Sequence, residues 1–176
     1  MLGWDRHLES WIAGHRVSVL DPVFRWLTYI GTWGAVWLVI AAMLALVWRR
    51  WQVLLWVAIA DIAAQLSARL LQDAFQRSRP DVRTLVAKPH SHSFPSGHAA
   101  SSFACAVVLA SLVPRWRVPL YVLAASIAFS RSYVGVHYPL DVVAGALWGV
   151  LLGKATLGAV RLTGRRRSSS GSRGTP

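Results

Sequence analysis

The sequence predicts an all-α fold: a polytopic membrane helix bundle of about five transmembrane helices, preceded by an amphipathic helix at the membrane interface, with six spans as the alternative count. Hydrophobic residues make up 55% of the 176-residue chain, more than a soluble domain of this length normally carries. Long apolar stretches alternate with short polar turns. Ten tryptophans, several next to arginines, are typical of side chains that anchor a protein at the lipid–water interface.

The N-terminal segment has a helical period. Its apolar residues recur at i, i+4, i+7 and i+8 and its charged residues occupy the other side, with Trp4, Leu8, Trp11 and Ile12 opposed to Asp5, Arg6 and Glu9. This pattern predicts a short helix lying in the plane of the membrane interface. The alternative interpretation is a helix of the kind found in soluble proteins, packed on the bundle.

Two spans come next. Residues 26–48 contain no charged side chain and are long enough to cross the hydrocarbon, and a pair of arginines ends this span. The second span covers residues 51–75 and carries polar side chains at intervals of four, four and three: Asp61, Gln65, Arg69 and Gln72. That spacing places them on one stripe, and ionisable groups at membrane depth face the bundle interior or a water-filled site. The stripe therefore points inward and leads to a polar loop.

Three further spans are expected at residues 96–113, 118–133 and 140–160. The last of them begins near Pro139, which suits the first turn of a helix. It also has a glycine at every fourth position, Gly145, Gly149 and Gly153, so that another helix can approach closely along that face. We treat residues 1–163 as one integral membrane domain. Residues 164–176, rich in Arg, Ser and Gly, are expected to form a basic, disordered cytoplasmic tail.

The net charge of +12 bears on both partners and orientation. Nucleic acid is not expected as a partner, because the basic residues cap apolar segments and form no solvated face; the bilayer and a lipid phosphate are expected instead. No protein partner can be inferred. Arginines near residues 49–50, 115–117 and 161–167 flank one membrane face, which should be cytoplasmic. The 76–95 loop and the 131–139 turn then share the outer face of the cell membrane, where the cations of that loop need an anion.

Groups that bind phosphate are concentrated in these two outer segments. A helix is expected to begin at Ser96-Gly97-His98, and the free N–H groups and positive dipole at its start make an anion site. Arg79 and Arg131 can each offer planar, bidentate donors to phosphoryl oxygens.

Groups suited to proton and phosphoryl transfer lie beside them. Asp141 follows His137 by four residues and can hold one ring nitrogen, which leaves the other free as nucleophile or base. A second imidazole, His98, can protonate the leaving oxygen. The sequence therefore predicts a phosphoryl-transfer site that requires no metal ion and no cofactor.

Three motifs carry a resemblance to a known family. In order, they are Arg79-Pro80, Pro95-Ser96-Gly97-His98 and Ser130-Arg131-x5-His137-x3-Asp141. They resemble the signature motifs of the type 2 phosphatidic acid phosphatases, which share their site with the vanadium haloperoxidases. The resemblance covers about residues 20–160. It implies an integral membrane enzyme that dephosphorylates lipid phosphates and isoprenoid diphosphates.

The resemblance also implies a role for each matched residue. His137 would attack phosphorus and form a phosphohistidine, Asp141 would orient His137, and His98 would be the general acid. The phosphoryl oxygens would be held by Arg79, Arg131, Ser96 and the amide of Gly97.

One position departs from the family pattern. The first motif of the family is Lys, six residues, then Arg-Pro, and the lysine position is Gln72 in this chain. An amide can still donate to a phosphoryl oxygen but supplies no charge, a loss worth about a few kcal/mol of transition-state stabilisation. Arg69 lies three residues earlier on the same face and can reach outward to restore that charge. The interpretation that the sequence favours is instead that Arg69 pairs with Asp61; a third is that Arg77 or Lys88 folds in from the loop.

The predicted function is therefore an integral membrane lipid phosphatase. Undecaprenyl diphosphate is the leading substrate, and phosphatidic acid, phosphatidylglycerol phosphate and another polyprenyl phosphate are alternatives. A degenerate, non-catalytic lipid-phosphate binding protein is the second hypothesis, which Gln72 favours and the intact His98, His137 and Asp141 oppose. A vanadate-dependent peroxidase is the third, and hydropathy argues against it because those enzymes resemble soluble proteins.

Overall fold

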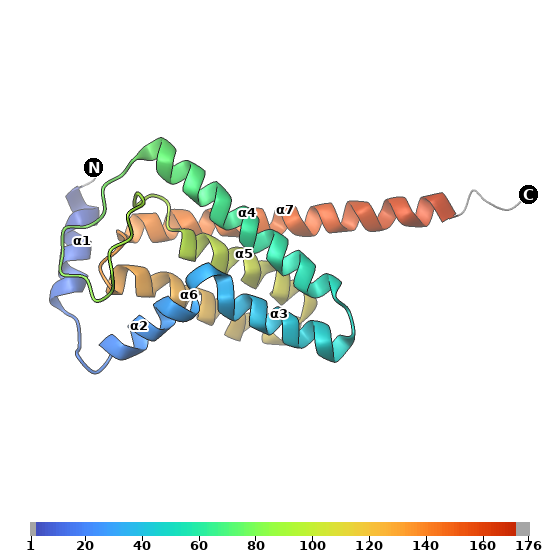
Figure 1. Ribbon diagram of the computed structural model, residues 1–176, viewed down its shortest axis with the longest axis horizontal. Helices are drawn as coiled ribbons and strands as arrows, with labels where there is room; N and C mark the ends of the chain where they lie inside the picture. Colours follow the sequence, from blue (N-terminus) through green and yellow to red (C-terminus); the bar gives the residue numbers. More distant parts are fainter. Residues whose placement is uncertain (1–2, 172–176) are drawn as a thin grey trace, which may run out of the picture.

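The computed structural model describes residues 3–171, with side chains described through residue 162, and this part of the chain contains helices but no strand. The all-α prediction is confirmed. The helices are α1 (Gly3–Gly14), α2 (Asp21–Ile30), α3 (Ala35–Trp48), α4 (Gln52–Phe75), α5 (Gly97–Leu112), α6 (Arg117–Tyr133) and α7 (Pro139–Gly171), with short 3-10 turns η1 (Thr32–Gly34) and η2 (Pro114–Trp116). Helix α1 lies across one end of the bundle, and α7 extends beyond the other helices (Figure 1).

Within the described residues, two helices are long and apolar enough to cross a membrane, Gln52–Phe75 and Pro139–Leu162. A third span results if the bent pair formed by α2 and the η1–α3 segment is counted as one. Helix α5 is apolar but has only 16 residues. The predicted number of about five spans therefore stays a prediction. Helix α7 covers residues 164–171 of the expected tail, and residues 172–176 lie outside the described residues.

The span expected at residues 26–48 is not one straight helix. Helices α2 and α3 meet at a bend of 59°, where Trp33 and Gly34 both have positive φ, of 54° and 65°. A Cβ atom on Gly34 would overlap the carboxylate of Asp61, and one on Gly31 would overlap Ile127 and contact the ring of His98. The two glycines therefore let the backbone of the bend press against α4, α5 and α6.

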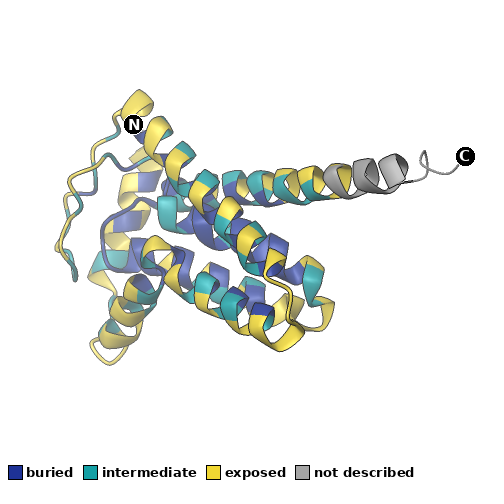
Figure 2. Cartoon of the chain, turned by 45° about the vertical axis from the view of Figure 1, so that its right-hand side comes forward, coloured by how far each residue is buried: buried dark blue, intermediate teal, exposed yellow. Residues whose placement is uncertain are grey.

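Helix α5 is the centre of the bundle and packs against α4, α6 and α7. Nearly all of its residues from Ala99 to Ala110 are buried, and Figure 2 shows the exposed residues on the outward faces of the surrounding helices. The glycine stripe of α7 lies against it: methyl groups at Gly145 and Gly149 would overlap the carbonyls of Ser96 and Ala100. This confirms the predicted close approach, which holds the start of α5 beside the start of α7.

Helix α1 presents its apolar side outward. Trp4 and Trp11 are 55% and 53% exposed, whereas Asp5 and Glu9 are fully buried against the bundle. The helix does pack on α6 and α7, as the alternative expected, but it does so through its charged side, whereas a helix of the soluble type would bury the apolar side. The orientation agrees with a helix whose apolar side contacts the membrane interface.

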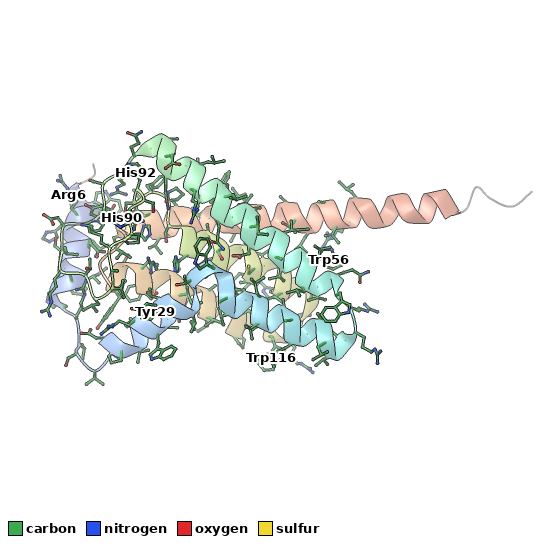
Figure 3. All side chains as sticks on the ribbon, viewed as in Figure 1. Arg6, Tyr29, Trp56, His90, His92 and Trp116 are labelled. Carbon is green, nitrogen blue, oxygen red and sulfur yellow. The ribbon has the colours of Figure 1, made fainter. Side chains whose placement is uncertain are left out.

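The two ends of the bundle differ. At one end the α3–α4 turn and the end of α5 line a common cavity, next to exposed arginines at positions 49, 50, 115 and 117. At the other end the loop after α4 meets the α6–α7 turn, where the amide of Leu85 donates to the carbonyl of Val134 at 3.0 Å. Figure 3 shows Trp56 and Trp116 well separated from His90 and His92 along the molecule. The two segments expected to share a face therefore do lie together.

Candidate active site

One cavity of about 250 Å³ collects most of the predicted site residues. It lies where the end of α4, the start of α5, the end of α6 and the α6–α7 turn meet. These parts of the ribbon are at the left of Figure 1. The predicted residues in its wall are Gln72, Arg79, Gly97, His98, Arg131 and His137. Predicted residues separated by as many as 65 positions, from Gln72 to His137, therefore line a single compartment.

The imidazole of His137 is buried and held in one orientation. Its Nδ1 atom lies 2.7 Å from the carbonyl oxygen of Ser93. A carbonyl oxygen can only accept, so Nδ1 carries the proton and the lone pair is on Nε2, which faces Arg79. Burial, reinforced by the positive charges of Arg79 and Arg131 and opposed by Asp141, lowers the pKa of His137 to about 4. The imidazole is therefore neutral at pH 7.

Asp141 supports this arrangement from behind the ring. Its carboxylate is 3.7 Å from Nδ1 of His137, outside hydrogen-bond distance, so the expected direct bond is replaced by an indirect one. The Ser93 hydroxyl donates to Oδ2 of Asp141 at 2.5 Å, and the amide of Tyr138 donates to the same oxygen at 3.0 Å. Ser93 thus bridges Asp141 and His137, a role that sequence reasoning missed because Ser93 lies outside the matched motif residues.

Arg79 is fixed by the loop that precedes α5. Its Nε and Nη2 atoms donate to the carbonyls of Ser91 and His92 at 2.7 and 3.0 Å, and Nη1 donates to the carbonyl of Val136 at 2.7 Å. Nη1 also donates to Nε2 of His137 at 3.2 Å, a bond that a phosphoryl group entering the cavity would have to replace. Desolvation by burial lowers the pKa of Arg79 to about 10, which leaves it charged at neutral pH.

Two side chains in the cavity wall have unpartnered nitrogen atoms. Nε of Arg131 and Nε2 of His98 are buried without a hydrogen-bond partner in the described part of the chain. Arg131 is 4% exposed, on the last turn of α6, and His98 lies on the first turn of α5. A buried polar atom without a partner is costly, so both atoms are suited to a ligand that enters the cavity.

The remaining predicted phosphate contacts have local partners. The Ser96 hydroxyl accepts from the amide of Ala99 and so caps α5, and the amide of Ser96 donates to the carbonyl of Asp141 at 2.9 Å. Gln72 is buried and its Nε2 donates to the carbonyl of Pro95 at 2.9 Å. Gly97 lines the cavity. Ser96 and Gln72 therefore brace the start of α5, next to the position where an anion would lie.

The polar stripe of α4 is arranged differently from the favoured interpretation. Asp61 accepts from Gln65 at 2.8 Å and from the hydroxyl of Ser101. The guanidinium of Arg69 lies over the ring of Trp33, 5.1 Å from the ring centroid. The expected Asp61–Arg69 pair is therefore wrong. Arg69 instead lines the same cavity as His137, on the wall formed by α4 and the bend.

Charged residues outside the motifs also surround the site. Arg77 donates to both Asp5 and Asp141. Sequence reasoning did not assign Asp5 to the site and considered Arg77 only as an alternative source of the missing lysine charge. Among the described residues, no group of three or more His, Cys, Asp or Glu side chains is arranged to hold a metal ion. His90 and His92 belong to the loop that covers the site, and the carbonyl of His92 accepts from Arg79.

Comparison with known proteins identifies the family. The model of the PAP2 superfamily matches residues 50–165. The chain is 30% identical over 154 residues to an undecaprenyl-diphosphatase of Sulfolobus acidocaldarius, covering 84% of this chain and 74% of that protein. It is 34% identical over 151 residues to a decaprenylphosphoryl-5-phosphoribose phosphatase of Mycobacterium tuberculosis, covering 81% and 83%.

A solved structure shares the fold. The transmembrane PAP2-type phosphatidylglycerolphosphate phosphatase of Bacillus subtilis superposes with a TM-score of 0.76 at 26% identity, covering 89% of this chain and 84% of that one. The expected relation to type 2 phosphatidic acid phosphatases is confirmed. The chain belongs to the PAP2 superfamily and is a lipid phosphatase of the membrane type.

Proposed function

We propose that this protein hydrolyses a polyprenyl diphosphate, with undecaprenyl diphosphate as the leading substrate, through a phosphohistidine on His137. The observation that carries the proposal is the cavity in which the unprotonated Nε2 atom of His137 meets the cations Arg79 and Arg131 and the unpartnered Nε2 atom of His98. A nucleophile, charge stabilisers and a proton donor in one compartment are what phosphoryl transfer needs.

In the first step, Nε2 of His137 forms a bond to phosphorus, and the bond between phosphorus and the leaving oxygen breaks. Arg79 and Arg131 neutralise the charge on the phosphoryl oxygens. The leaving oxygen takes a proton from His98. In the second step a water molecule, deprotonated by His98, attacks the phosphohistidine, which releases inorganic phosphate and restores His137.

The position of Arg69 in the cavity favours a diphosphate substrate over a monophosphate substrate. The leaving group of a diphosphate is itself a phosphate, which carries negative charge and needs a cation of its own. Arg69 lines the cavity together with Gln65 and Ser101, and Ser101 lies about one helical turn beyond His98 along α5. Arg69 is thus placed to neutralise a leaving phosphate that His98 protonates.

The proposal also includes the position of the substrate in the membrane and the side on which the site opens. The lipid chain would lie in the bilayer while the diphosphate enters the cavity at the end of the bundle opposite the exposed arginine turns. Because arginine-rich turns are retained in the cytoplasm, the site would open on the outer side. Labelling of the His90→Cys variant in intact cells, on a Cys105→Ser background, tests this; labelling only after permeabilisation would overturn it.

The test of the reaction is a lipid panel on one purified preparation. Undecaprenyl diphosphate should release phosphate faster than undecaprenyl phosphate, phosphatidic acid or phosphatidylglycerol phosphate. Brief reaction with 32P-labelled substrate should trap an acid-labile, base-stable label on the protein, and His137→Ala should abolish both label and turnover. Absence of phosphate release from every lipid would support the non-catalytic alternative, and turnover by folded His137→Ala would refute the mechanism.

A further inference from the structure

We propose that Asp5 and Arg77 are positioning residues for the reaction, so that helix α1 is part of the active site although it contributes no group to the cavity. The proposal rests on the function proposed for His137. Two carboxylates from opposite ends of the chain, Asp5 on α1 and Asp141 on α7, share the guanidinium of Arg77.

The side chain of Arg77 holds Asp141. Its Nη1 atom donates to Oδ1 of Asp141 and its Nη2 atom to Oδ2 of Asp5, each at 2.5 Å. Both carboxylates are fully buried and the Arg77 side chain is 13% exposed, stacked 4.3 Å from the ring centroid of Tyr138. A planar guanidinium can bridge two carboxylates in this way, whereas an ammonium group has the charge and the donors but lacks the fixed planar geometry.

The main chain of Arg77 holds the second support of the nucleophile. Its carbonyl oxygen accepts from the amide of Ser93 at 2.8 Å, and the carbonyl of Ser93 in turn accepts from Nδ1 of His137. Arg77 therefore fixes both groups that orient the imidazole, namely Asp141 through its side chain and Ser93 through its backbone.

Asp5, on α1, also holds the start of α7. Its Oδ1 atom accepts from the amide of Leu140 at 3.0 Å, in the first turn of α7, one residue before Asp141. The same carboxylate thus fixes the position of Arg77 and the start of the helix that carries Asp141. The outward side of α1 exposes Trp4 and Trp11, so the helix that carries Asp5 is also the one suited to contact the membrane interface.

Asp5 and Arg77 lie outside the cavity, and this limits which kinetic constants their replacement can change. The cavity wall contains Arg79, Arg131 and His137 but neither Asp5 nor Arg77. Loss of either residue should therefore misplace the nucleophile without removing a contact to the phosphate. The expected result is a lower kcat at nearly unchanged affinity for a phosphate analogue.

The experiment compares Arg77→Gln, Arg77→Lys, Asp5→Asn and the Asp5→Asn/Arg77→Gln double variant in the full-length protein. We expect kcat to fall about 100-fold in Arg77→Gln and about tenfold in Asp5→Asn, with partial recovery in Arg77→Lys. The inhibition constant of vanadate should stay within about twofold of the wild-type value. Because Asp5 acts through Arg77, the double variant should be no worse than Arg77→Gln, a strongly non-additive result.

Glu9→Gln is the matched control. Glu9 is also a buried acid on α1, but neither of its oxygens has a hydrogen-bond partner among the described side chains. Its replacement should leave kcat unchanged. Additive losses in the double variant, or an equal fall in kcat in Glu9→Gln, would show that α1 matters only for folding and would overturn the proposal.

A second measurement keeps this inference separate from the proposed function. Arg77 offsets the negative charge of Asp141, which faces His137 together with the cations Arg79 and Arg131. Removing the charge of Arg77 should therefore raise the pKa of His137, measured by NMR titration of the labelled imidazole in Arg77→Gln. An unshifted titration would refute the positioning role. Wild-type protein inactive on every lipid would refute the proposed function alone, since the titration still tests the positioning.

Discussion

The imidazole of His137 donates to the main-chain carbonyl of Ser93 at 2.7 Å, while the carboxylate of Asp141 remains 3.7 Å from the same Nδ1 atom. Asp141 therefore acts on the imidazole through its charge and through the hydroxyl of Ser93, which donates to Oδ2 of Asp141. This arrangement divides the orientation of the nucleophile between a backbone group, which no substitution removes, and a side chain, which can be tested.

Ser93→Ala should reduce turnover moderately. The variant keeps the carbonyl that holds Nδ1 of His137 but loses the hydroxyl that fixes Asp141. We expect kcat to fall about tenfold, corresponding to one hydrogen bond to a charged group. Steady-state kinetics in detergent check the result, with circular dichroism to confirm folding. An activity equal to the wild type would mean that the serine hydroxyl does not contribute.

The value of kcat/KM should stay high to an unusually low pH. A histidine ordinarily titrates at about 6.5, but burial and two neighbouring arginines lower the pKa of His137 to about 4. The attacking form is the neutral imidazole, which is lost only when the pH falls through this lowered pKa. The quantity to measure is kcat/KM between pH 3.5 and 8, corrected for ionisation of the substrate. An acid limb near 6.5 that remains after the correction would contradict the assignment.

Arg69 should matter more for diphosphates than for monophosphates. It lines the cavity beside Trp33, while Gln72 donates to the carbonyl of Pro95 and supplies no charge. We expect Arg69→Gln to lower kcat/KM for undecaprenyl diphosphate by about 10–100-fold, as for a lost charge-assisted hydrogen bond, and to affect the monophosphate less.

Adding Gln72→Lys to that variant should recover much of the loss, because the lysine would return a positive charge to the same stripe of α4. Arg49→Gln, at the opposite and exposed end of the bundle, is the control and should leave kinetics unchanged. A folded double variant that stays as slow as Arg69→Gln would refute compensation by Arg69.

Activity should not depend on a divalent metal ion. The cations Arg79 and Arg131 can supply the charge that a metal would provide, and the described residues offer no acidic or imidazole cluster for one. We expect EDTA to leave phosphate release unchanged, and vanadate to inhibit competitively by occupying the phosphoryl site. Loss of activity with EDTA that Mg²⁺ restores would count against the mechanism.

Glu9 should make stability depend on pH. Burial raises the pKa of this carboxyl from 4.5 to about 8. An acid with a raised folded pKa contributes stability that is fully present below pH 4.5 and is lost as the pH rises through 8. The thermal midpoint of Glu9→Gln should therefore fall less between pH 5 and pH 8 than that of the wild type, by an amount equivalent to about a few kcal/mol at most. Parallel curves would show that Glu9 does not titrate in this range.

The sequence by itself determined the all-α class, the start of α5 at Ser96-Gly97, and the close contact along Gly145 and its neighbours. These features repeat within one helix or occur as short motifs, and the period of a helix sets which residues share a face. The order of the motifs along the chain was equally informative, because the family model matches the same region of the chain.

Only the tertiary structure decided how distant segments meet. The bridge of Arg77 between Asp5 and Asp141 joins residues 72 and 64 positions apart, and nothing in their local sequence marks them as partners. The bend at Gly31 and the stacking of Arg69 on Trp33 likewise depend on neighbouring helices. Spacing along a chain specifies contacts within a regular element, whereas contacts across loops follow from how the whole chain buries its charges and fills its interior.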